Sequence, residues 1–550
     1  MTRVNFRRPA AALLALAAVA CGDQLVVENN NNPDVERVFA AVATIEQTIG
    51  TGYQQCRNAY QANTTETQLL VMSLESYSQL NNFSMGTRVG IPRTPIVNSR
   101  GGPGTGEPWD TYSLLARLSR QLSNGIGSLN KIKTEQPTQV PLGLYARVRS
   151  FGYFGVACAL GNLALVFDST GIVGPGMPGD SIPPLSDYKA VMNVALAYLD
   201  SAVNIAGSAD AANTADGGYP APASWMSGTS LTRDQFVQIA RQMRARFRAQ
   251  VARTPAERAA VNWDLVIADA NAGVTAAIMA TIGGSSGWNI GFQSSQMHVS
   301  AGWSQISPMY WGMADVSGAY DAWLATPRDN RAAFLVVTPD KRWPQGNTRA
   351  LQQAASPEPS AHTSFPYIRN RSTSLDVPGD PWGTSNYDYV RYKYIRNGAS
   401  TGPWPEFRPE EAALIAAEGY IRKGQIALAA AKIDPTRIRA GLPALSGVVA
   451  SLTDPVPGGA SCVPRVPVGP NFTSTACGNI LEAMKYEMRI EMAHGRFGSW
   501  YFDSRGWGDL VTGTAFHFPV PNQEMDARQK PFYDMGGGGP GTAPRGTYGF

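Results

Sequence analysis

Aromatic residues in the middle of the chain are the side chains best suited to bind a ligand. The stretch SAGWSQISPMYWGMADVSGAYDAW at 300–323 places Trp303, Tyr310 and Trp311 among Gly, Ser and Asp residues. A sugar ring packs its apolar face on an aromatic side chain, and its hydroxyl groups need polar partners at the rim. This stretch therefore predicts an aromatic surface of the kind that holds a sugar ring.

Two further tryptophans and several polar residues extend this candidate set. Trp109 follows a Gly/Pro/Asn-rich loop at 81–108, and Trp382 lies in DPWGTSNYDY. Asp321 and Asn386 are candidates for the polar rim. The other rim candidates are Asn81, Asn82 and Arg88. The alternative interpretation is that each tryptophan fixes a loop onto the scaffold, in which case its ring is buried.

Aspartates near the aromatic residues raise the question of catalysis. A helical glycosidase needs two carboxyl groups about 5–10 Å apart, and nothing in the sequence places any two of Asp315, Asp321 and Asp329 together. Asp329, in PRDNR, is better explained by an ion pair or a turn cap. Phosphate-loop and serine-nucleophile motifs are absent. We therefore expect a binding protein without enzymatic activity and without a cofactor.

A single cysteine, Cys21, ends the N-terminal leader. Residues 3–8 contain three arginines, and the Ala/Leu/Val-rich run at 10–20 is too short to span a bilayer. This pattern predicts a signal peptide at 1–20. The cysteine at its end resembles a bacterial lipoprotein signal, in which the thiol receives a diacylglycerol. The alternatives are a plain secretory peptide cleaved near Ala20 or an uncleaved anchor, and we expect no later membrane-spanning segment.

Four other cysteines, the histidines and the net charge indicate which disulfides, metal sites and nucleic-acid partners to expect. An even number of thiols in an exported chain allows two disulfides. Cys462 and Cys477 flank a Pro/Gly/Thr-rich loop and are the favoured pair, whereas Cys56 and Cys158 are left either paired or singly buried. The four histidines are scattered, so no metal site is expected. The net charge is +4, of which the leader supplies three, so we expect no nucleic-acid partner.

The chain has 550 residues, and helical patterns dominate it outside residues 281–404. The clearest helix is 231–251, where Thr232 and Gln235 form a capping box. Phe236, Ile239, Met243 and Phe247 recur on one face of it. Its arginines, Arg241, Arg244, Arg246 and Arg248, are interpreted as a solvated face rather than an anion site. A partner helix is expected at 263–280.

Further helices are expected at 109–133, 141–167, 185–206, 408–423, 425–433 and 478–494. Pro435 is expected to end one of them, and the stripe Ile480, Met484, Met488 and Met492 to face the core. Strand alternation is rare. We therefore predict a predominantly all-α fold of helical hairpins with few short strands, although no strict 34-residue repeat is present.

Motifs toward the C-terminus resemble the RagB/SusD family. Residues 408–443 contain Glu411-Ala412, Ala417-Glu418-Gly419, Gly424, Arg437/Arg439 and Ala440-Gly441-Leu442-Pro443. The stretch KYEMRIEMAHGRFGSWYFDSRGWGDL at 485–510 and PVPNQE at 519–524 continue the resemblance, as does Leu25-Val26-Val27-Glu28-Asn29 near the start. The usual acidic-Gly-x-Arg motif is replaced by His494-Gly495-Arg496, which leaves the local hydrogen bonding open.

The resemblance implies a tetratricopeptide-like helical scaffold with a loop-rich ligand surface, anchored in the outer membrane through the lipid and facing the cell exterior. It also implies partnership with a SusC-like TonB-dependent transporter, to which the protein delivers oligosaccharide or, in some branches, peptide. In that family the motifs at 408–524 are structural and do not contact ligand. A helical-repeat surface adaptor without a small ligand remains the alternative.

The expected organisation follows from these segments. Residues 1–20 are the signal peptide and 21–34 a lipidated tether. An N-terminal helical region at 35–280 precedes the aromatic, loop-rich insertion at 281–404, and a C-terminal RagB/SusD-like region completes the chain at 405–550.

Overall fold

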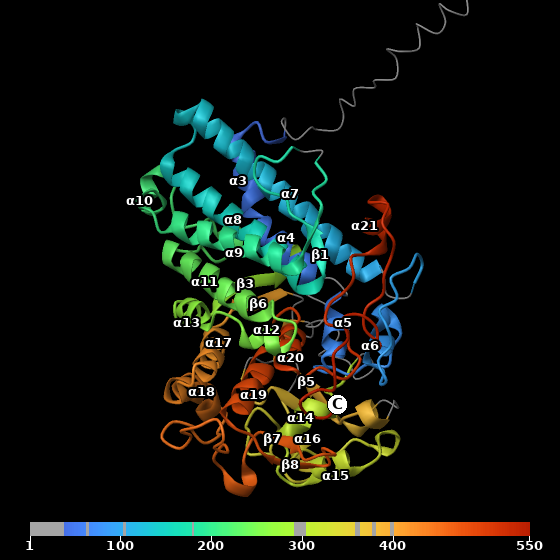
Figure 1. The fold of residues 1–550 in the computed structure, drawn as a ribbon. Helices are drawn as coiled ribbons and strands as arrows, with labels where there is room; N and C mark the ends of the chain where they lie inside the picture. The colour runs from blue at the N-terminus through green and yellow to red at the C-terminus, as the bar shows by residue number, and fades with distance from the viewer. Residues whose placement is uncertain are drawn as a thin grey trace, which may run out of the picture.

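The structure is a computed structural model that describes residues 38–61, 65–102, 106–178, 181–290, 304–357, 364–376, 381–395 and 401–550. Long helices form one side of the molecule and a loop-rich part with short helices forms the other (Figure 1). The N-terminal helices are α3 (Val42–Gly50), α4 (Gly52–Gln61), α5 (Thr65–Met72), α6 (Met85–Val89), α7 (Gly106–Glu135), α8 (Leu142–Val166), α9 (Tyr188–Ala206), α10 (Ala209–Ala212), α11 (Arg233–Gln250), α12 (Pro255–Ala259) and α13 (Trp263–Asn271).

The C-terminal half adds shorter helices. Its helices are α14 (Pro308–Trp311), α15 (Ala319–Ala325), α16 (Arg349–Ala355), α17 (Pro409–Arg422), α18 (Ile426–Arg439), α19 (Ile480–Met492), α20 (Ser499–Trp507) and α21 (Asn522–Ala527). Within the described residues, four two-stranded antiparallel sheets are spread over both halves of the chain. They pair β1 (Ser169–Gly171) with β2 (Leu185–Asp187), β3 (Ile278–Gly283) with β6 (Thr401–Phe407), β4 (Ile368–Asn370) with β5 (Tyr387–Tyr389), and β7 (Arg465–Val468) with β8 (Ser474–Cys477). The predicted, predominantly α-helical fold is confirmed.

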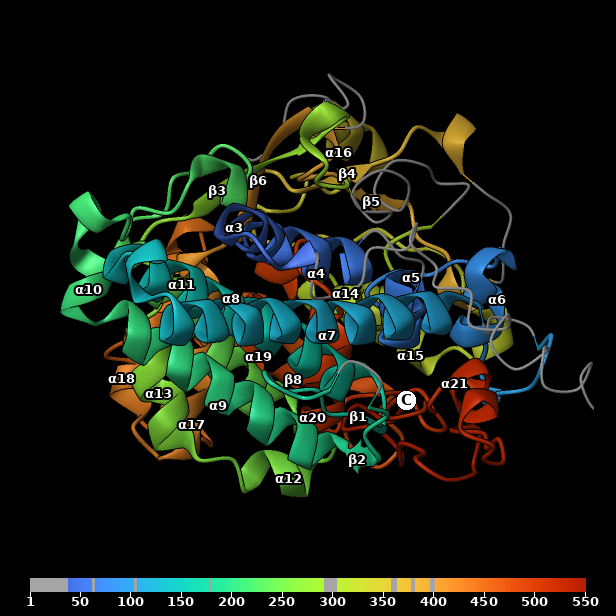
Figure 2. The ribbon, with the colours of Figure 1, turned by 90° about the horizontal axis from the view of Figure 1, so that it is seen from above.

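Helices α7, α8 and α9 lie side by side, and α11 packs beside α9 (Figures 1 and 2). The capping box of α11 is present, since Thr232 Oγ1 accepts from the Gln235 peptide and Gln235 Oε1 accepts from the Thr232 peptide. The four apolar residues predicted on one face of α11 are buried in the main core. The hydrophobic spacing therefore predicted this helix correctly.

Helix α8 corrects the expectation that no later segment is long and apolar enough to span a membrane. By length and composition Leu142–Val166 meets that criterion, but 89% of its most apolar window is buried inside the protein. It packs against α7, α9 and α4 as a core helix. A core helix buried on all sides is apolar around its whole circumference, like a membrane-spanning one.

The segment after Asn271 corrects a second expectation. The predicted helix at 263–280 ends at Asn271, and Ile278–Gly283 forms β3, which pairs with β6. The partner strand lies more than a hundred residues away, so local periodicity could not reveal it. In the C-terminal half, α18 runs through Pro435 to Arg439 instead of ending before it.

The arginines of α11 are not a solvated face, so that interpretation is wrong. Arg244 Nε donates to Asp269 Oδ2 at 2.7 Å, and Arg246 Nε donates to Glu411 Oε1 at 2.7 Å. Arg248 also pairs with Asp269. The arginines bind carboxylates on α13 and α17, and thereby join the N-terminal helices to the C-terminal ones.

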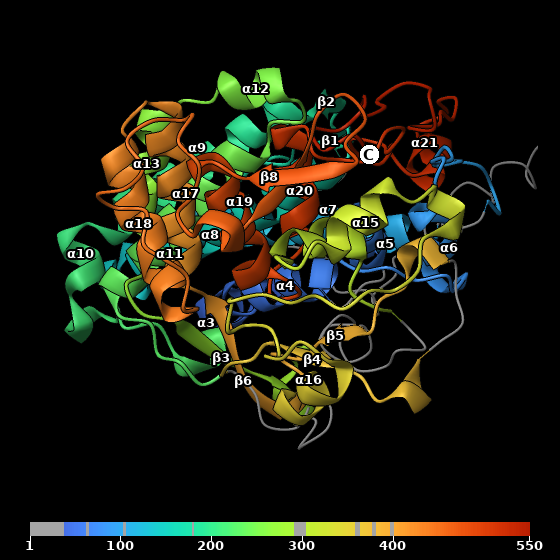
Figure 3. The same cartoon turned by 90° about the horizontal axis from the view of Figure 1, so that it is seen from below.

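Two disulfides and a second core complete the scaffold. Cys56 on α4 bonds to Cys158 on α8, and Cys462 bonds to Cys477. The stripe of Ile480, Met484, Met488 and Met492 is buried, as predicted, in a smaller core that lies between α13, α17, α18 and α19. Seen from below, α13, α17 and α18 lie together on one side, and α15 lies across from them (Figure 3).

Candidate functional site

The aromatic stretch at 304–323 is held in place by its own polar residues. Ser307 caps α14 by accepting from the Met309 peptide, and Asp315 accepts from the peptides of Tyr320 and Val337. Asp315 therefore organises the backbone around α15. Asp329 pairs with Arg328 at 2.7 Å on the surface, as predicted.

Tyr310 and Trp311 are buried, with 3% and 2% of their surface exposed. Trp311 stacks on Trp500 with ring centroids 5.0 Å apart, and its Nε1 donates to the main-chain oxygen of Glu75 at 3.0 Å. Tyr310 donates its hydroxyl to the main-chain oxygen of Asp509. In this structure both rings attach the loop-rich region to α20 and its surroundings, and neither presents a face to solvent.

Trp382 is also buried, with 2% of its surface exposed. Its ring lies edge-on to Tyr77, with centroids 4.9 Å apart. Tyr77 and Gln305 form an antiparallel bridge, and Gln305 Oε1 accepts from the Ser385 peptide at 2.9 Å. Three segments that are distant in sequence therefore meet here, at 77, 305 and 382–385. Sequence reasoning missed Tyr77 and Gln305, because each owes its role to partners far along the chain.

The remaining candidate residues are either half-buried or lie outside the described residues. Asn386 is half-buried and its main-chain oxygen accepts from the Arg371 peptide at 2.8 Å. Asp321 is half-buried on α15, and its Oδ1 has no hydrogen-bond partner among the described residues. Trp109 is half-buried on α7 and stacks on Tyr112. Trp303 and Cys21 lie outside the described residues.

Polar residues predicted for the rim divide into two groups. Asn81 and Asn82 are exposed in the loop that follows Tyr77, next to a half-buried Phe83 with a positive φ of 55°. Arg88 is buried and donates to Gln68 Oε1 at 3.0 Å. The loop that follows Tyr77 therefore presents exposed amides, whereas Tyr77 itself and Trp382 are buried.

Two surface grooves lie on the helical scaffold, away from these residues. One, of about 400 Å³, lies between α9 and α11–α12 and is lined by Met192, Leu196 and Val251, among others. The other, of about 600 Å³, lies where α17 turns into α18 and is lined by Leu428 and Val448, among others. Among the described residues, no group of three or more His, Cys, Asp or Glu side chains is placed to hold a metal ion.

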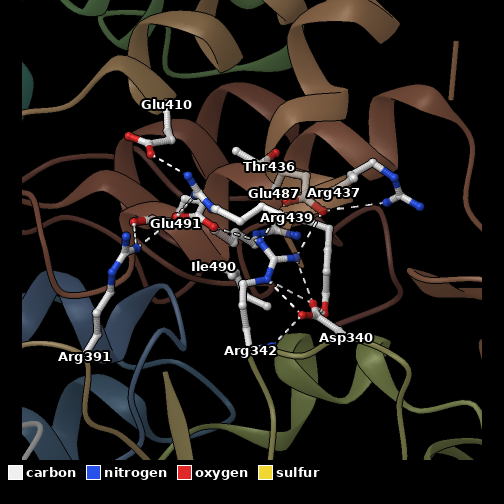
Figure 4. Close-up of polar contacts among 12 residues, drawn as sticks. Asp340, Arg342, Arg391, Glu410, Thr436, Arg437, Arg439, Glu487, Ile490 and Glu491 are labelled. Atoms are coloured by element: carbon white, nitrogen blue, oxygen red, sulfur yellow. Dashed lines mark hydrogen bonds and ion pairs between the residues drawn. The ribbon is translucent and has the colours of Figure 1, made fainter. Parts of the chain in front are cut away.

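Residues of the motifs at 408–524 form a buried network of ion pairs with Asp340, Arg342 and Arg391 of the loop-rich region (Figure 4). Arg342 contacts Asp340 at 2.8 Å, Glu487 at 2.7 Å and Glu491 at 3.1 Å. Burial alone would raise the pKa of Glu491, but Arg391, Arg342 and Arg439 outweigh it and lower that pKa to about 2. These carboxylates are fully engaged with arginines and are therefore structural.

His494-Gly495-Arg496, which replaces the acidic-Gly-x-Arg motif typical of the family, is buried in the same core. Arg496 pairs with Glu411 and with Asp503, and Glu411 also accepts from Arg246. His494 is buried against Ser76 and Tyr389. Burial lowers the pKa of His494 to about 3, so its imidazole is neutral at physiological pH.

Comparison with known proteins identifies the family. The SusD family profile matches residues 293–535. A solved SusD superfamily protein from Bacteroides vulgatus is 12% identical with a TM-score of 0.53, covering 88% of this chain and 96% of that one. One from Bacteroides thetaiotaomicron is 14% identical with a TM-score of 0.46, covering 89% and 97%. A laminarin-binding SusD-like protein is 13% identical with a TM-score of 0.49, covering 91% and 100%.

No curated protein sequence matches the chain. The structural likeness, at these identities, concerns the fold, and of the three structures the one from Bacteroides vulgatus carries it. The family assignment rests on the sequence profile. Its match covers most of the loop-rich region, the buried motifs and the PVPNQE segment. The resemblance predicted from the motifs is therefore confirmed, and over residues 293–535 the chain is SusD/RagB-like.

Proposed function

We propose that this chain is an outer-membrane lipoprotein that binds a nutrient, most simply an oligosaccharide, and delivers it to a SusC-like TonB-dependent transporter. The observation that carries this proposal is the SusD family match over 293–535, in a chain whose whole fold resembles a SusD superfamily structure. Members of this family are generally binding proteins associated with the outer membrane. A peptide ligand is the second possibility within the same family.

The cysteines support the proposed location of the chain. All four cysteines beyond Cys21 are paired in the structure, as Cys56–Cys158 and Cys462–Cys477. Disulfides persist in oxidising compartments outside the cytosol, which supports export. Two or more acyl chains on Cys21 would give stable anchoring, where a single chain binds a membrane only weakly.

The proposed ligand surface lies where the 77–83, 305 and 382–386 segments meet. On α7, the half-buried ring of Trp109, which stacks on Tyr112, is proposed as a further ligand contact. Support comes from the exposed amides of Asn81 and Asn82 and from the convergence of three distant segments there. Loops held on a rigid scaffold are the usual carriers of binding residues. An adaptor without a small ligand would not need this arrangement.

A titration of intrinsic tryptophan fluorescence with a panel of oligosaccharides and peptides tests the proposal. Replacing Trp109 with alanine is expected to weaken binding of the active ligand by about tenfold, or ~1.4 kcal/mol, because a ring face is lost from the sugar-stacking surface. Tyr198→Ala is the matched control, since Tyr198 is a half-buried aromatic residue on α9. Equal weakening by both variants, or no response to either ligand class, would contradict the proposal.

A further inference from the structure

Glu75 is a carboxyl group enclosed between the loop-rich region and the C-terminal helices. It lies in the loop 73–78 after α5 and is fully buried. Its Oε1 accepts from the His494 peptide at 2.5 Å, and its Oε2 has no hydrogen-bond partner among the described residues. Its main-chain oxygen accepts from Trp311 Nε1 at 3.0 Å. Glu75 therefore touches both the aromatic stretch and the turn after α19.

The groups around Glu75 do not supply a counter-charge in contact with it. Arg496 is the cation that acts on it through space, but its guanidinium pairs with Glu411 and Asp503. His494 is neutral, with its ring near Ser76 and stacked on Tyr389. Among the described residues, no lysine, arginine or histidine forms an ion pair with Glu75.

A buried carboxylate loses the hydration that stabilises its charge, and one peptide N–H does not replace it. A neutral carboxylic acid avoids most of that cost and can still accept the His494 N–H. Ionisation of Glu75 would therefore favour opening of the loop 73–78, so that water could reach the carboxylate.

We propose that Glu75 is a positioning residue that holds the loop 73–78 against the turn at His494 only as a neutral acid, so that this attachment is sensitive to pH. We call this contact between Glu75 and the His494 peptide the latch. The same loop carries Tyr77, which contacts Trp382 and bridges Gln305. The latch thereby reaches the segments proposed to support the ligand surface, and in that respect it rests on the proposed function. Burial raises the pKa of Glu75 to about 8, against smaller opposing effects of the His494 peptide and Arg496.

Because the pKa of Glu75 is raised, the stability that Glu75 contributes decreases as the pH rises. Between the ordinary glutamate pKa of about 4.3 and the raised value, the folded chain holds a proton that the unfolded chain releases. The stabilising contribution is complete below the unfolded pKa and is lost as the pH rises toward 8. Carboxylates paired with arginines, such as Glu491, have the opposite dependence.

The test compares wild type with Glu75→Gln by urea unfolding at several pH values between 5.5 and 8.5. Glutamine keeps the acceptor and cannot ionise. The ratio of the wild-type unfolding constant to that of the variant is expected to rise by up to about tenfold per pH unit in this window. Hydrogen exchange in 73–78 and 304–311, corrected for intrinsic rates, should lose protection at high pH in wild type only.

Ser76→Ala is the matched control, because it removes the contact with His494 and leaves the carboxyl group in place. It is expected to shift stability by the same factor at every pH. Should Glu75→Gln fail to fold, infrared difference spectra of wild type between pH 6 and 9 must still show the loss of a buried carboxylic-acid C=O band. A constant ratio across pH, or no such band, would overturn the latch. No ligand is used, so this outcome is independent of the proposed function.

Discussion

Replacing Arg342 with methionine is expected to destabilise the fold by about 3–5 kcal/mol or to prevent folding altogether. The guanidinium is fully buried and contacts Asp340, Glu487 and Glu491. Methionine fills part of the space but leaves these carboxylates without their shared partner. Breaking a buried charge network by removing one partner is far more costly than replacing the whole network, because uncompensated charge stays buried.

Urea unfolding followed by circular dichroism measures this effect. After the substitution, the one arginine that still pairs with Glu487 among the described residues is Arg437, at 3.7 Å, whereas Glu491 keeps Arg391 at 2.9 Å and Arg439 at 3.1 Å. The matched control is Arg328→Met, which removes an exposed pair with Asp329 and should change stability by less than about 1 kcal/mol. If Arg342→Met is as stable as the control, the network does not hold the C-terminal helices to the loop-rich region.

Removal of the Cys56–Cys158 disulfide by double alanine substitution is expected to cost about 4–5 kcal/mol. The bond closes a loop of 102 residues between α4 and α8. On the chain-entropy account, a cross-link stabilises more when the loop that it closes is longer. The Cys462–Cys477 bond closes only 15 residues, so its double alanine variant should lose about 3 kcal/mol.

The two bonds should also differ in their response to a mild reductant under native conditions. Cys56 and Cys158 are buried, whereas Cys477 is half-exposed, so the 462–477 bond is expected to be reduced first. Alkylation and mass spectrometry of the quenched protein would show the order. Equal losses of stability in the two variants, with 56–158 reduced first, would contradict this account of the scaffold.

Patterns within short stretches of sequence correctly predicted the elements that are determined by residues close together in the chain. The capping box at Thr232 and Gln235 and the Met stripe of α19 needed only spacing along one helix. The motifs at 408–524 identified the family, and their carboxylates and arginines occupy the buried network. In each case the information lay within about one helix or one motif.

The sequence patterns did not predict features that depend on residues far apart in the chain. The arginines of α11 resemble a solvated face until Asp269 and Glu411 are placed beside them. Ile278–Gly283 continues a helical pattern until β6 pairs with it. Composition could not distinguish a tryptophan that binds ligand from one that fixes a loop, and Trp311 and Trp382 are both buried by residues more than 150 positions away, Trp500 and Tyr77 respectively.

Co-purification of the transporter tests the central claim most directly. The affinity-tagged full-length chain would be extracted from membranes of its own cells in mild detergent, and its partners identified by mass spectrometry. The account predicts a TonB-dependent transporter in an amount comparable to the chain itself, with both absent from the eluate of untagged cells. A chain that sediments with membranes but elutes without any transporter would contradict it.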